Sequence, residues 1–215
     1  MHKETVPVWD IAVRSFHWSL VIAFTIAWLS GDEEDSLHIY TGYAVLALIS
    51  FRLLWGFIGS RHARFSDFLT SPGEVIAYLK SLKDQPRHYL GHNPAGGWMI
   101  LLMLLTLFGI TLSGLKVYGL EGHGPLAANL TAPAIISQAH ADEDDERYEH
   151  EGMSAAGEHE GNEADEDLWE EIHETLTDFM LLLIALHILG VFVSSRLHGE
   201  NLAKAMITGN KESRD

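Results

Sequence analysis

Four long apolar stretches, each with little or no charge, alternate with polar segments along the chain of 215 residues. They are hydrophobic on all sides, which is typical of membrane helices and disfavours a soluble four-helix bundle. With a few flanking residues, each is about long enough to cross a hydrocarbon core of roughly 30 Å. We therefore predict an all-α membrane protein, a single domain over residues 1–215, built as a bundle of four transmembrane helices. The predicted spans cover residues 12–31, 38–60, 94–117 and 169–195.

The distribution of charge predicts the orientation of these helices. Lys and Arg concentrate before the first span, between the second and third, and after the fourth. Acidic residues concentrate between positions 121 and 171, and the chain carries a net charge of −16. Because cytoplasmic loops carry the excess of Lys and Arg, we expect both termini and the 61–93 loop in the cytoplasm. The long acidic 119–168 loop should then face the periplasm, as in a multi-pass protein of a bacterial inner membrane.

Local signals add detail to the cytoplasmic loop. Ser71-Pro72-Gly73-Glu74 has the spacing of a capping box, with proline at the first helical position. It predicts a short helix that lies on the inner membrane surface. Asn93-Pro94 predicts the cap and the start of the third span in the same way.

The acidic segment 139–167 has few large apolar residues, and we expect a mobile loop because it cannot bury enough surface to offset its ordering entropy. It contains several histidines among carboxylates, a combination that could bind Zn, Cu or Ni. We favour a solvated loop without a metal over a dedicated metal site. The histidines concerned are His123, His140, His150 and His159.

The absence of cysteine narrows the possible cofactors. The chain contains none, which excludes disulfides, thiolate metal sites, iron–sulfur clusters and covalent c-type haem attachment through this chain. Any haem must therefore be held by side chains such as histidine.

Four histidines lie in or at the edge of the predicted spans, at two depths. His173 and His187 are fourteen residues apart on one predicted helix, which places them about 21 Å apart along the axis and on nearly the same face. With the predicted orientation, His17 lies at the depth of His187 near the cytoplasm, and His38 lies at the depth of His173 near the periplasm. Two imidazole pairs stacked across a bilayer would hold two haems b and occupy both axial positions of each iron. Such centres transfer single electrons and leave no position for a substrate.

Two arginines are candidate partners for haem propionates. Arg52 follows His38 by fourteen residues, which places it about 21 Å inward, level with the inner pair. A buried arginine is costly unless it is paired, so we favour a propionate over lipid phosphate for Arg52. Arg14 lies three residues before His17 on the same helix face, and for it both partners remain open.

Two glycines lie close to the candidate ligands. Gly42 follows His38 by one turn, and Gly190 follows His187 by three residues. Small residues at these positions would let a flat macrocycle approach the helix. Close helix–helix packing is an equally good explanation.

Several motifs lie at both ends of the chain and around the candidate ligands: Arg14-Ser-Phe-His17-Trp18, His38-x-x-x-Gly42-Tyr43, Arg52-Leu-Leu-Trp55-Gly56, Gly91-His-Asn-Pro-Ala-Gly96, His187, Arg196-Leu-His-Gly-Glu-Asn201 and Met206-Ile-Thr-Gly209. Together they resemble the bacterial cytochrome b561 and nickel-hydrogenase cytochrome b family. The resemblance covers both ends of the chain and all but the acidic loop. It implies a four-helix membrane protein with two b haems, ligated by histidines on spans one, two and four, that exchanges electrons between membrane quinone and a redox partner.

The leading functional hypothesis is a membrane electron conduit between quinone and a periplasmic c-type cytochrome, hydrogenase or other dehydrogenase. Whether the chain is also an enzyme in its own right is left open, as is a homodimer; no nucleic-acid partner is expected. A superoxide:quinone oxidoreductase ranks lower. It would need an exposed cationic entrance near the outer haem, and Lys116 and Arg147 are the only bases near that position. A divalent-metal transporter is disfavoured by the positive charge of Arg14 and Arg52 inside the bundle. A structural anchor without a cofactor would not account for the matched histidine depths.

Overall fold

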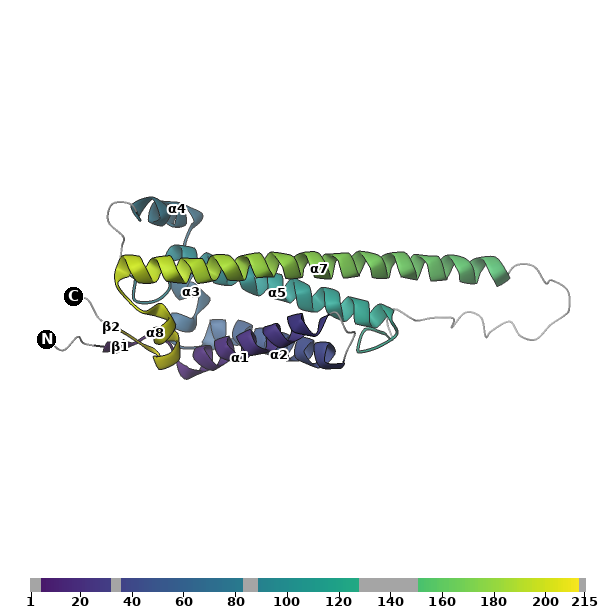
Figure 1. Cartoon of the computed structure of the whole chain (residues 1–215), viewed down its shortest axis with the longest axis horizontal. Coiled ribbons are helices and arrows are strands. Elements are labelled where there is room, and N and C mark those ends of the chain that lie inside the picture. Colours follow the sequence, from purple (N-terminus) through teal and green to yellow (C-terminus); the bar gives the residue numbers. More distant parts are fainter. Residues whose placement is uncertain (1–4, 32–35, 83–88, 128–150, 213–215) are drawn as a thin grey trace. The chain divides into compact units, whose positions relative to one another are not determined.

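The computed structural model describes residues 5–31, 36–82, 89–127 and 151–212, with the backbone alone for residues 151–163. Four long helices within these ranges each contain a stretch long and apolar enough to cross a membrane. They confirm the predicted helices, and three of them match the predicted ends within three residues. The four are α1 (Ile11–Leu29), α2 (Ser36–Ile58), α5 (Pro94–Leu120) and α7 (Glu151–His198), shown in Figure 1.

The fourth helix is much longer than predicted. Helix α7 begins at Glu151, whereas the predicted span began at residue 169, so the expectation of an irregular acidic loop is wrong from Glu151 onward. Alanine and glutamate, both strong helix formers, recur between Glu151 and Asp167. Extending an existing membrane helix also requires no new nucleus. The remainder of that loop prediction, residues 139–150, lies outside the described residues.

Short elements fill the segment between α2 and α5. They are η2 (Arg61–Ala63), α3 (Phe65–Phe68) and α4 (Pro72–Ser81). The predicted capping box of α4 is present, since Ser71 Oγ accepts from Glu74 N at 3.3 Å and Glu74 Oε2 accepts from Ser71 N at 3.1 Å. The predicted cap of α5 is also confirmed, because Asn93 Oδ1 accepts from Gly96 N at 2.7 Å.

The two ends of the chain are joined by a small antiparallel sheet. Strand β1 (Thr5–Pro7) pairs with β2 (Asn210–Glu212), which follows α8 (Leu202–Thr208). Val8 N and Trp9 N both donate to the Gly209 carbonyl, at 2.8 and 3.0 Å. Gly209 has φ +84°, and a Cβ there would lie 2.7 Å from the Trp9 carbonyl oxygen. The turn between α8 and β2 therefore requires glycine.

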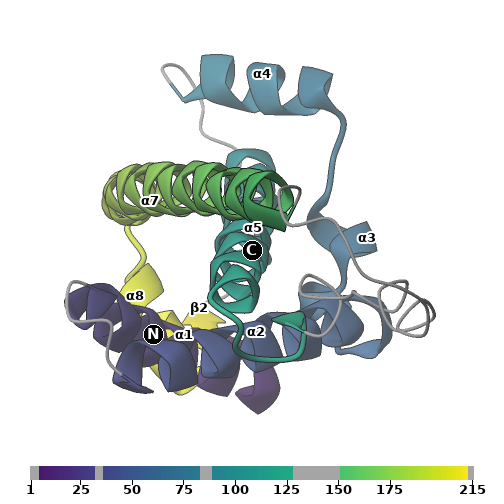
Figure 2. The ribbon, with the colours of Figure 1, turned by 90° about the vertical axis from the view of Figure 1, so that its right-hand side faces the viewer.

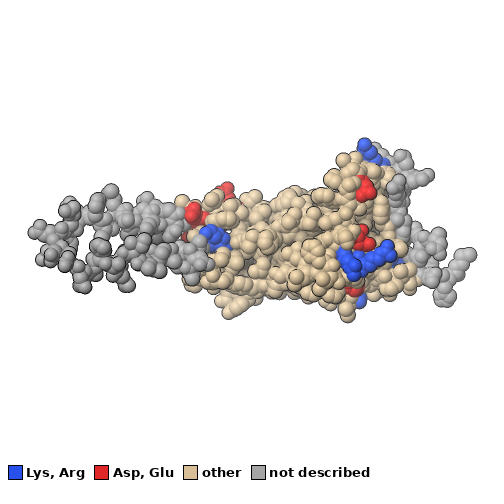
Figure 3. Space-filling view, turned by 180° about the vertical axis from the view of Figure 1, so that it is seen from behind, with Lys and Arg blue, Asp and Glu red and all other residues tan. Residues whose placement is uncertain are grey.

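Contacts group the chain into two units. The first is Met1–Phe108 with Phe179–Asp215, and the second is Gly109–Asp178. In the first unit, α1 packs along α2, as two views show (Figure 1 and Figure 2). On the face drawn in Figure 3, the charged side chains of this unit gather at one end and uncharged surface lies beyond them.

Asp10 ties the start of α1 to the end of α2. Its carboxylate accepts from Val13 N at 2.7 Å, from Trp55 Nε1 at 3.1 Å and from Ser60 Oγ. Burial raises the pKa of Asp10, but the hydrogen bonds from Ser60, Val13 and Trp55 outweigh it, so the pKa lies below its ordinary value. The charged form of Asp10 is therefore the form that holds the two helices together.

Candidate functional site

The first unit brings His17 of α1 together with His187 of α7. The two imidazoles are close enough to interact electrostatically, and both side chains are half-buried. His17 Nδ1 is fully buried and has no hydrogen-bond partner within the part of the chain that the structure describes. A buried ring nitrogen without a partner is costly, and a cofactor that uses the nitrogen would remove that cost.

Arg52 is buried in the same unit, with 3% of its surface exposed. Its guanidinium carbon lies 5.1 Å from the centroid of the Phe65 ring and 5.9 Å from that of Phe68. These aromatic partners on α3 were not predicted from the sequence. A Cβ at Gly56 would lie 2.1 Å from Phe65 Cε2, so this glycine lets the ring reach the arginine. Among the described residues, Arg52 NH1 has no hydrogen-bond partner and is buried, so a cationic donor remains for an anionic group.

Arg14 has a partner other than the haem propionate and the lipid phosphate that the sequence suggested. Its NH1 donates to the carbonyl of Ile207 in α8, and a Cβ at Gly209 would lie 3.2 Å from its Cζ. The Nε of Arg14 is buried without a hydrogen-bond partner in the described ranges. The side chain therefore ties the C-terminal segment to α1, and its Nε remains available as a donor.

His92 is a buried titratable residue to which the sequence analysis assigned no role. Its ring lies between Trp9, with centroids 4.4 Å apart, and Phe68, with centroids 4.9 Å apart. Burial, reinforced by the positive charges of Arg52 and Lys211, lowers the pKa of His92 to about 3. His92 is therefore neutral at physiological pH. The only signal in the sequence was its place in the Gly91–Gly96 motif.

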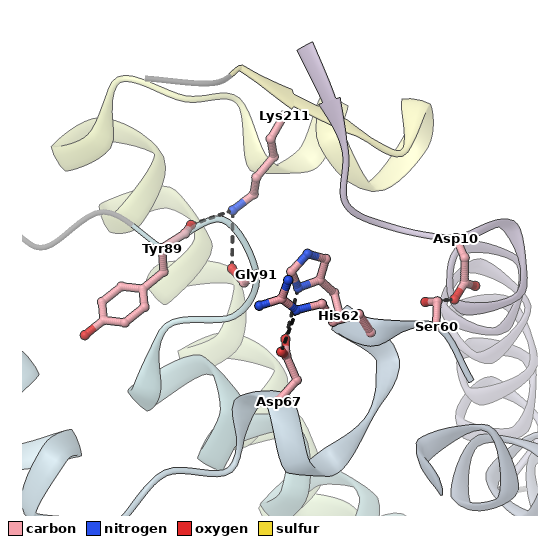
Figure 4. A network of polar contacts seen from close by, with 8 residues as sticks. Asp10, Ser60, His62, Asp67, Tyr89, Gly91 and Lys211 are labelled. Atoms are coloured by element: carbon pink, nitrogen blue, oxygen red, sulfur yellow. Dashed lines mark hydrogen bonds and ion pairs between the residues drawn. The ribbon is translucent and has the colours of Figure 1, made fainter. Parts of the chain in front are cut away.

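Lys211 of β2 reaches into the loop that precedes α5 (Figure 4). Its ammonium contacts the carbonyl oxygens of Tyr89 and Gly91, both at 3.4 Å, and lies 3.7 Å from the Glu200 carboxylate. Burial lowers the pKa of Lys211, and the Glu200 carboxylate opposes that shift. The contacts connect the C-terminal strand to the segment that carries His92.

A second group of polar side chains lies beside the loop that precedes α5. His62 Nδ1 is 3.0 Å from Asp67 Oδ2, and Arg61 Nε is 3.6 Å from Asp67 Oδ1 (Figure 4). A Cβ at Gly91 would lie 3.0 Å from His62 Nδ1, so the imidazole packs against the loop backbone. These side chains all lie on the side predicted to be cytoplasmic.

His38 lies at the other end of the first unit, near the start of α2. Its Nδ1 is 2.9 Å from the carbonyl oxygen of Ala27 in α1. A carbonyl can only accept, so Nδ1 carries the hydrogen and the lone pair of the neutral ring is on Nε2. That tautomer is the one that metal-bound histidines with a carbonyl partner adopt.

His173 belongs to the second unit and has the same tautomer. Its Nδ1 is 3.0 Å from the carbonyl oxygen of Ile110 and 3.1 Å from Ser113 Oγ. The Ile110 carbonyl again requires the hydrogen on Nδ1 and the lone pair on Nε2. Because His38 and His173 belong to different units, their predicted pairing stays a prediction.

The candidate glycines face space. Within the described residues, no atom beyond each glycine's own chain neighbours and helix backbone lies within 4 Å of the position that a Cβ would take at Gly42 or at Gly190. A flat ligand and a neighbouring helix are both compatible with this space, so the role of the two glycines stays a prediction.

No group of three or more potential metal-ligating side chains was found among the described residues. Of the loop histidines considered above, His140 and His150 lie outside the described ranges, and only the backbone of His159 is described. His123 stacks on Tyr118, with centroids 5.3 Å apart. The metal-binding alternative for this loop therefore stays untested.

The donor set fits haem b, which needs neutral imidazole nitrogens for its iron and cations for its propionates. Two histidines have a backbone carbonyl on Nδ1, a third has a buried nitrogen without a hydrogen-bond partner in the described chain, and Arg52 has a buried donor. No cysteine is needed. Four apolar helices that carry such histidines define the class of b-type membrane cytochromes.

The comparison with known families agrees with this class. The family model described as prokaryotic cytochrome b561 matches residues 8–209. The chain belongs to the prokaryotic cytochrome b561 family, as the resemblance in its motifs indicated. It is a prokaryotic integral membrane protein of the cytochrome b type.

The chain is also similar, at low sequence identity, to relatives with curated names. The chain is 24% identical over 155 residues to the probable Ni/Fe-hydrogenase B-type cytochrome subunit of Rhizobium leguminosarum bv. viciae, a match that covers 58% of this chain and 64% of the relative. It is 24% identical over 152 residues to the protein of the same name from Rhodobacter capsulatus, which covers 57% and 58%. The chain thus spans less than two thirds of the length of these relatives. No solved structure gives a significant match.

Proposed function

We propose that this protein is a di-haem b cytochrome that passes electrons between membrane quinone and a periplasmic redox partner. The observation that carries the proposal is the tautomer of His38 and His173, each of which donates Nδ1–H to a backbone carbonyl and therefore has its lone pair on Nε2. In this proposal His17 and His187 hold the inner haem, and His38 and His173 hold the outer one. The haem, when bound, supplies one-electron oxidation and reduction.

The residues around the histidines have supporting roles in this proposal. Arg52 binds a propionate of the inner haem, because its buried NH1 needs an acceptor and Phe65 and Phe68 hold its plane in place. Arg14 contributes a second cation through its Nε. Gly42 and Gly190 leave room for the macrocycle beside α2 and α7.

The proposed orientation follows the charge distribution, with the termini and the Lys211–His92 side in the cytoplasm and the start of α7 in the periplasm. A positive cytoplasmic side is what the Lys/Arg bias predicts. The location is then the inner membrane of a bacterium. Membrane lipid surrounds the exposed apolar faces of the spans.

The partner is proposed from charge and from the names of the relatives. The periplasmic part of α7 carries consecutive acidic residues at Asp165, Glu166 and Asp167, which would attract a cationic surface and make association sensitive to salt. A hydrogenase subunit is one partner that the relatives' names suggest; a c-type cytochrome or another dehydrogenase is equally compatible. Replacing these three residues with their amides should slow electron transfer at low salt and leave the rate at high salt nearly unchanged.

The first test is a dithionite-reduced minus oxidised absorbance spectrum of the purified protein, with haem quantified per chain. Sharp bands of low-spin b-type haem at two haems per chain are expected. Purified protein without haem, from cells supplied with it, would contradict the proposal. Reduction of the haems by quinol, compared with reduction by superoxide, then separates the quinone conduit from a superoxide:quinone oxidoreductase.

A further inference from the structure

One turn of α5 surrounds the ring of His173 in the second unit. The carbonyl of Ile110 and the hydroxyl of Ser113 both contact Nδ1, at 3.0 and 3.1 Å. Ser113 Oγ also lies 3.0 Å from the Ile110 carbonyl oxygen, and 1% of the Ser113 surface is exposed. The three groups form a triangle around one nitrogen, and the hydroxyl at one corner is buried.

The positions of the hydrogens in this triangle follow from the donor inventory. The Ile110 carbonyl can only accept, so Nδ1 of His173 is a donor. Ser113 Oγ must then accept from the same N–H, and its own hydrogen goes to the Ile110 carbonyl. The single Nδ1–H is thus shared between a carbonyl and a hydroxyl. Nδ1 of His38 likewise donates to a backbone carbonyl, that of Ala27.

The next residue of the same turn makes room for the ring. A Cβ at Gly114 would lie 2.9 Å from Cε1 and 3.2 Å from Nδ1 of His173. Any other residue at this position would push the imidazole away from Ser113 and Ile110. The absence of a side chain at Gly114 therefore lets His173 come within hydrogen-bond distance of Ser113 and Ile110.

We propose that Ser113 is a positioning residue that holds and polarises His173, and that it thereby lowers the midpoint potential of the haem that His173 binds. The inference rests on the proposed function. Acceptors on Nδ1–H raise the basicity of a ligating imidazole, and a more basic ligand favours ferric over ferrous iron. Axial-ligand properties and hydrogen bonding of this kind are among the means by which a protein sets haem potentials.

The test is a potentiometric titration of the purified holoprotein with Ser113→Ala. Two haems should be retained, one midpoint potential should rise, and the other should stay where it is. Thr106→Val is the matched control, because Thr106 is a buried hydroxyl residue of α5 whose hydroxyl donates to the Leu102 carbonyl of its own helix. Both potentials should be unchanged in this control.

Gly114→Ala tests the same contact by displacing the ring. The electron paramagnetic resonance g values of one low-spin haem should change, or that haem should be lost, while the other haem keeps its signal. Gly109→Ala is the control, since a Cβ there would meet only the flexible end of Leu176, at 3.1 Å. Both haem signals should persist in the control.

The outcomes separate this inference from the proposed function. Wild-type protein without haem would overturn the proposed function itself. Wild-type protein with two haems, together with Ser113→Ala protein whose potentials are both unchanged or shift equally, would overturn the role of Ser113 alone. Loss of one haem in Ser113→Ala, with both kept in Thr106→Val, would also count against the proposed effect on the potential, because Ser113 would then be required for haem binding itself.

Discussion

The carbonyl oxygen of Ala27 in α1 accepts a hydrogen bond from Nδ1 of His38 in α2, at 2.9 Å. Ala27 lies in the last turn of α1, where carbonyls lack partners within the helix. The Ser30 hydroxyl donates to this carbonyl at 3.3 Å, the histidine supplies a second, closer donor, and the helix end in turn sets the tautomer of the histidine. One contact thus completes a helix terminus and prepares a candidate metal ligand.

The pairing of the histidines predicts which haem each substitution removes. His38→Ala and His173→Ala should each abolish the outer haem, and His187→Ala should abolish the inner one, because bis-imidazole ligation fails without one ligand. Each variant should retain about half of the haem of the wild type. The measurement is haem per chain with the reduced spectrum of the remaining haem. If His38→Ala and His173→Ala left spectrally different haems, the pairing would be wrong.

Removal of the buried cation at Arg52 should lower the potential of one haem. Positive charge near a haem favours the reduced iron, so Arg52→Gln should shift the inner midpoint potential downward while the outer one stays constant. Arg196→Gln is a suitable control, since its guanidinium also lies over a ring, Phe192 at 5.0 Å, but at an exposed position. A redox titration decides; equal shifts in both variants would count against a special role for Arg52.

Asp10 should stabilise the fold only in its charged form. Asp10→Ala removes an N-cap and two further hydrogen bonds, and loss of the cap alone typically costs about 1–2 kcal/mol. Because the folded state lowers the pKa of Asp10 below 3.8, its contribution is fully present above that pH and is lost as pH falls through the folded pKa. Thermal unfolding in detergent at several pH values checks this. A destabilisation that stayed constant down to strongly acid pH would contradict the assignment.

His92 should also make the protein less stable in acid, over a pH range above the one in which Asp10 acts. Its pKa is about 3 when folded and 6.5 in an ordinary environment, so between these values the unfolded chain binds a proton that the folded protein does not. Stability therefore falls as pH drops from about 6.5 toward 3. His92→Phe keeps a ring between Trp9 and Phe68 and should reduce that loss. Unfolding temperatures of both proteins across this range test the prediction, and parallel curves would refute it.

Much of the architecture could be predicted from the sequence because its causes are local. Apolar runs predict spans, since a helix satisfies its own backbone groups inside a membrane. The caps at Ser71 and Asn93 depend on residues three positions away. The predicted start of the fourth helix is wrong, because an acidic composition disfavours burial but does not disfavour helix, and strong helix formers next to a membrane helix extend it without a new nucleus.

The residues around the candidate ligands could not be predicted in the same way. Arg14 reaches Ile207, and His173 reaches Ile110 and Ser113, over separations that no local pattern encodes. His92 is a buried, neutral residue because Trp9 and Phe68 pack against it and the charges of Arg52 and Lys211 lie near it, and all four come from distant parts of the chain.

The sequence by itself determined the four apolar helices, the family and the four histidines that candidate haems would require. These features depend on residue type and on spacing along single helices. The tertiary structure alone decided which nitrogen of His38 and His173 carries the hydrogen, which rings enclose Arg52 and where Arg14 is tied. Hydrogen bonds and burial between distant segments set these properties, because they exist only once the helices have packed.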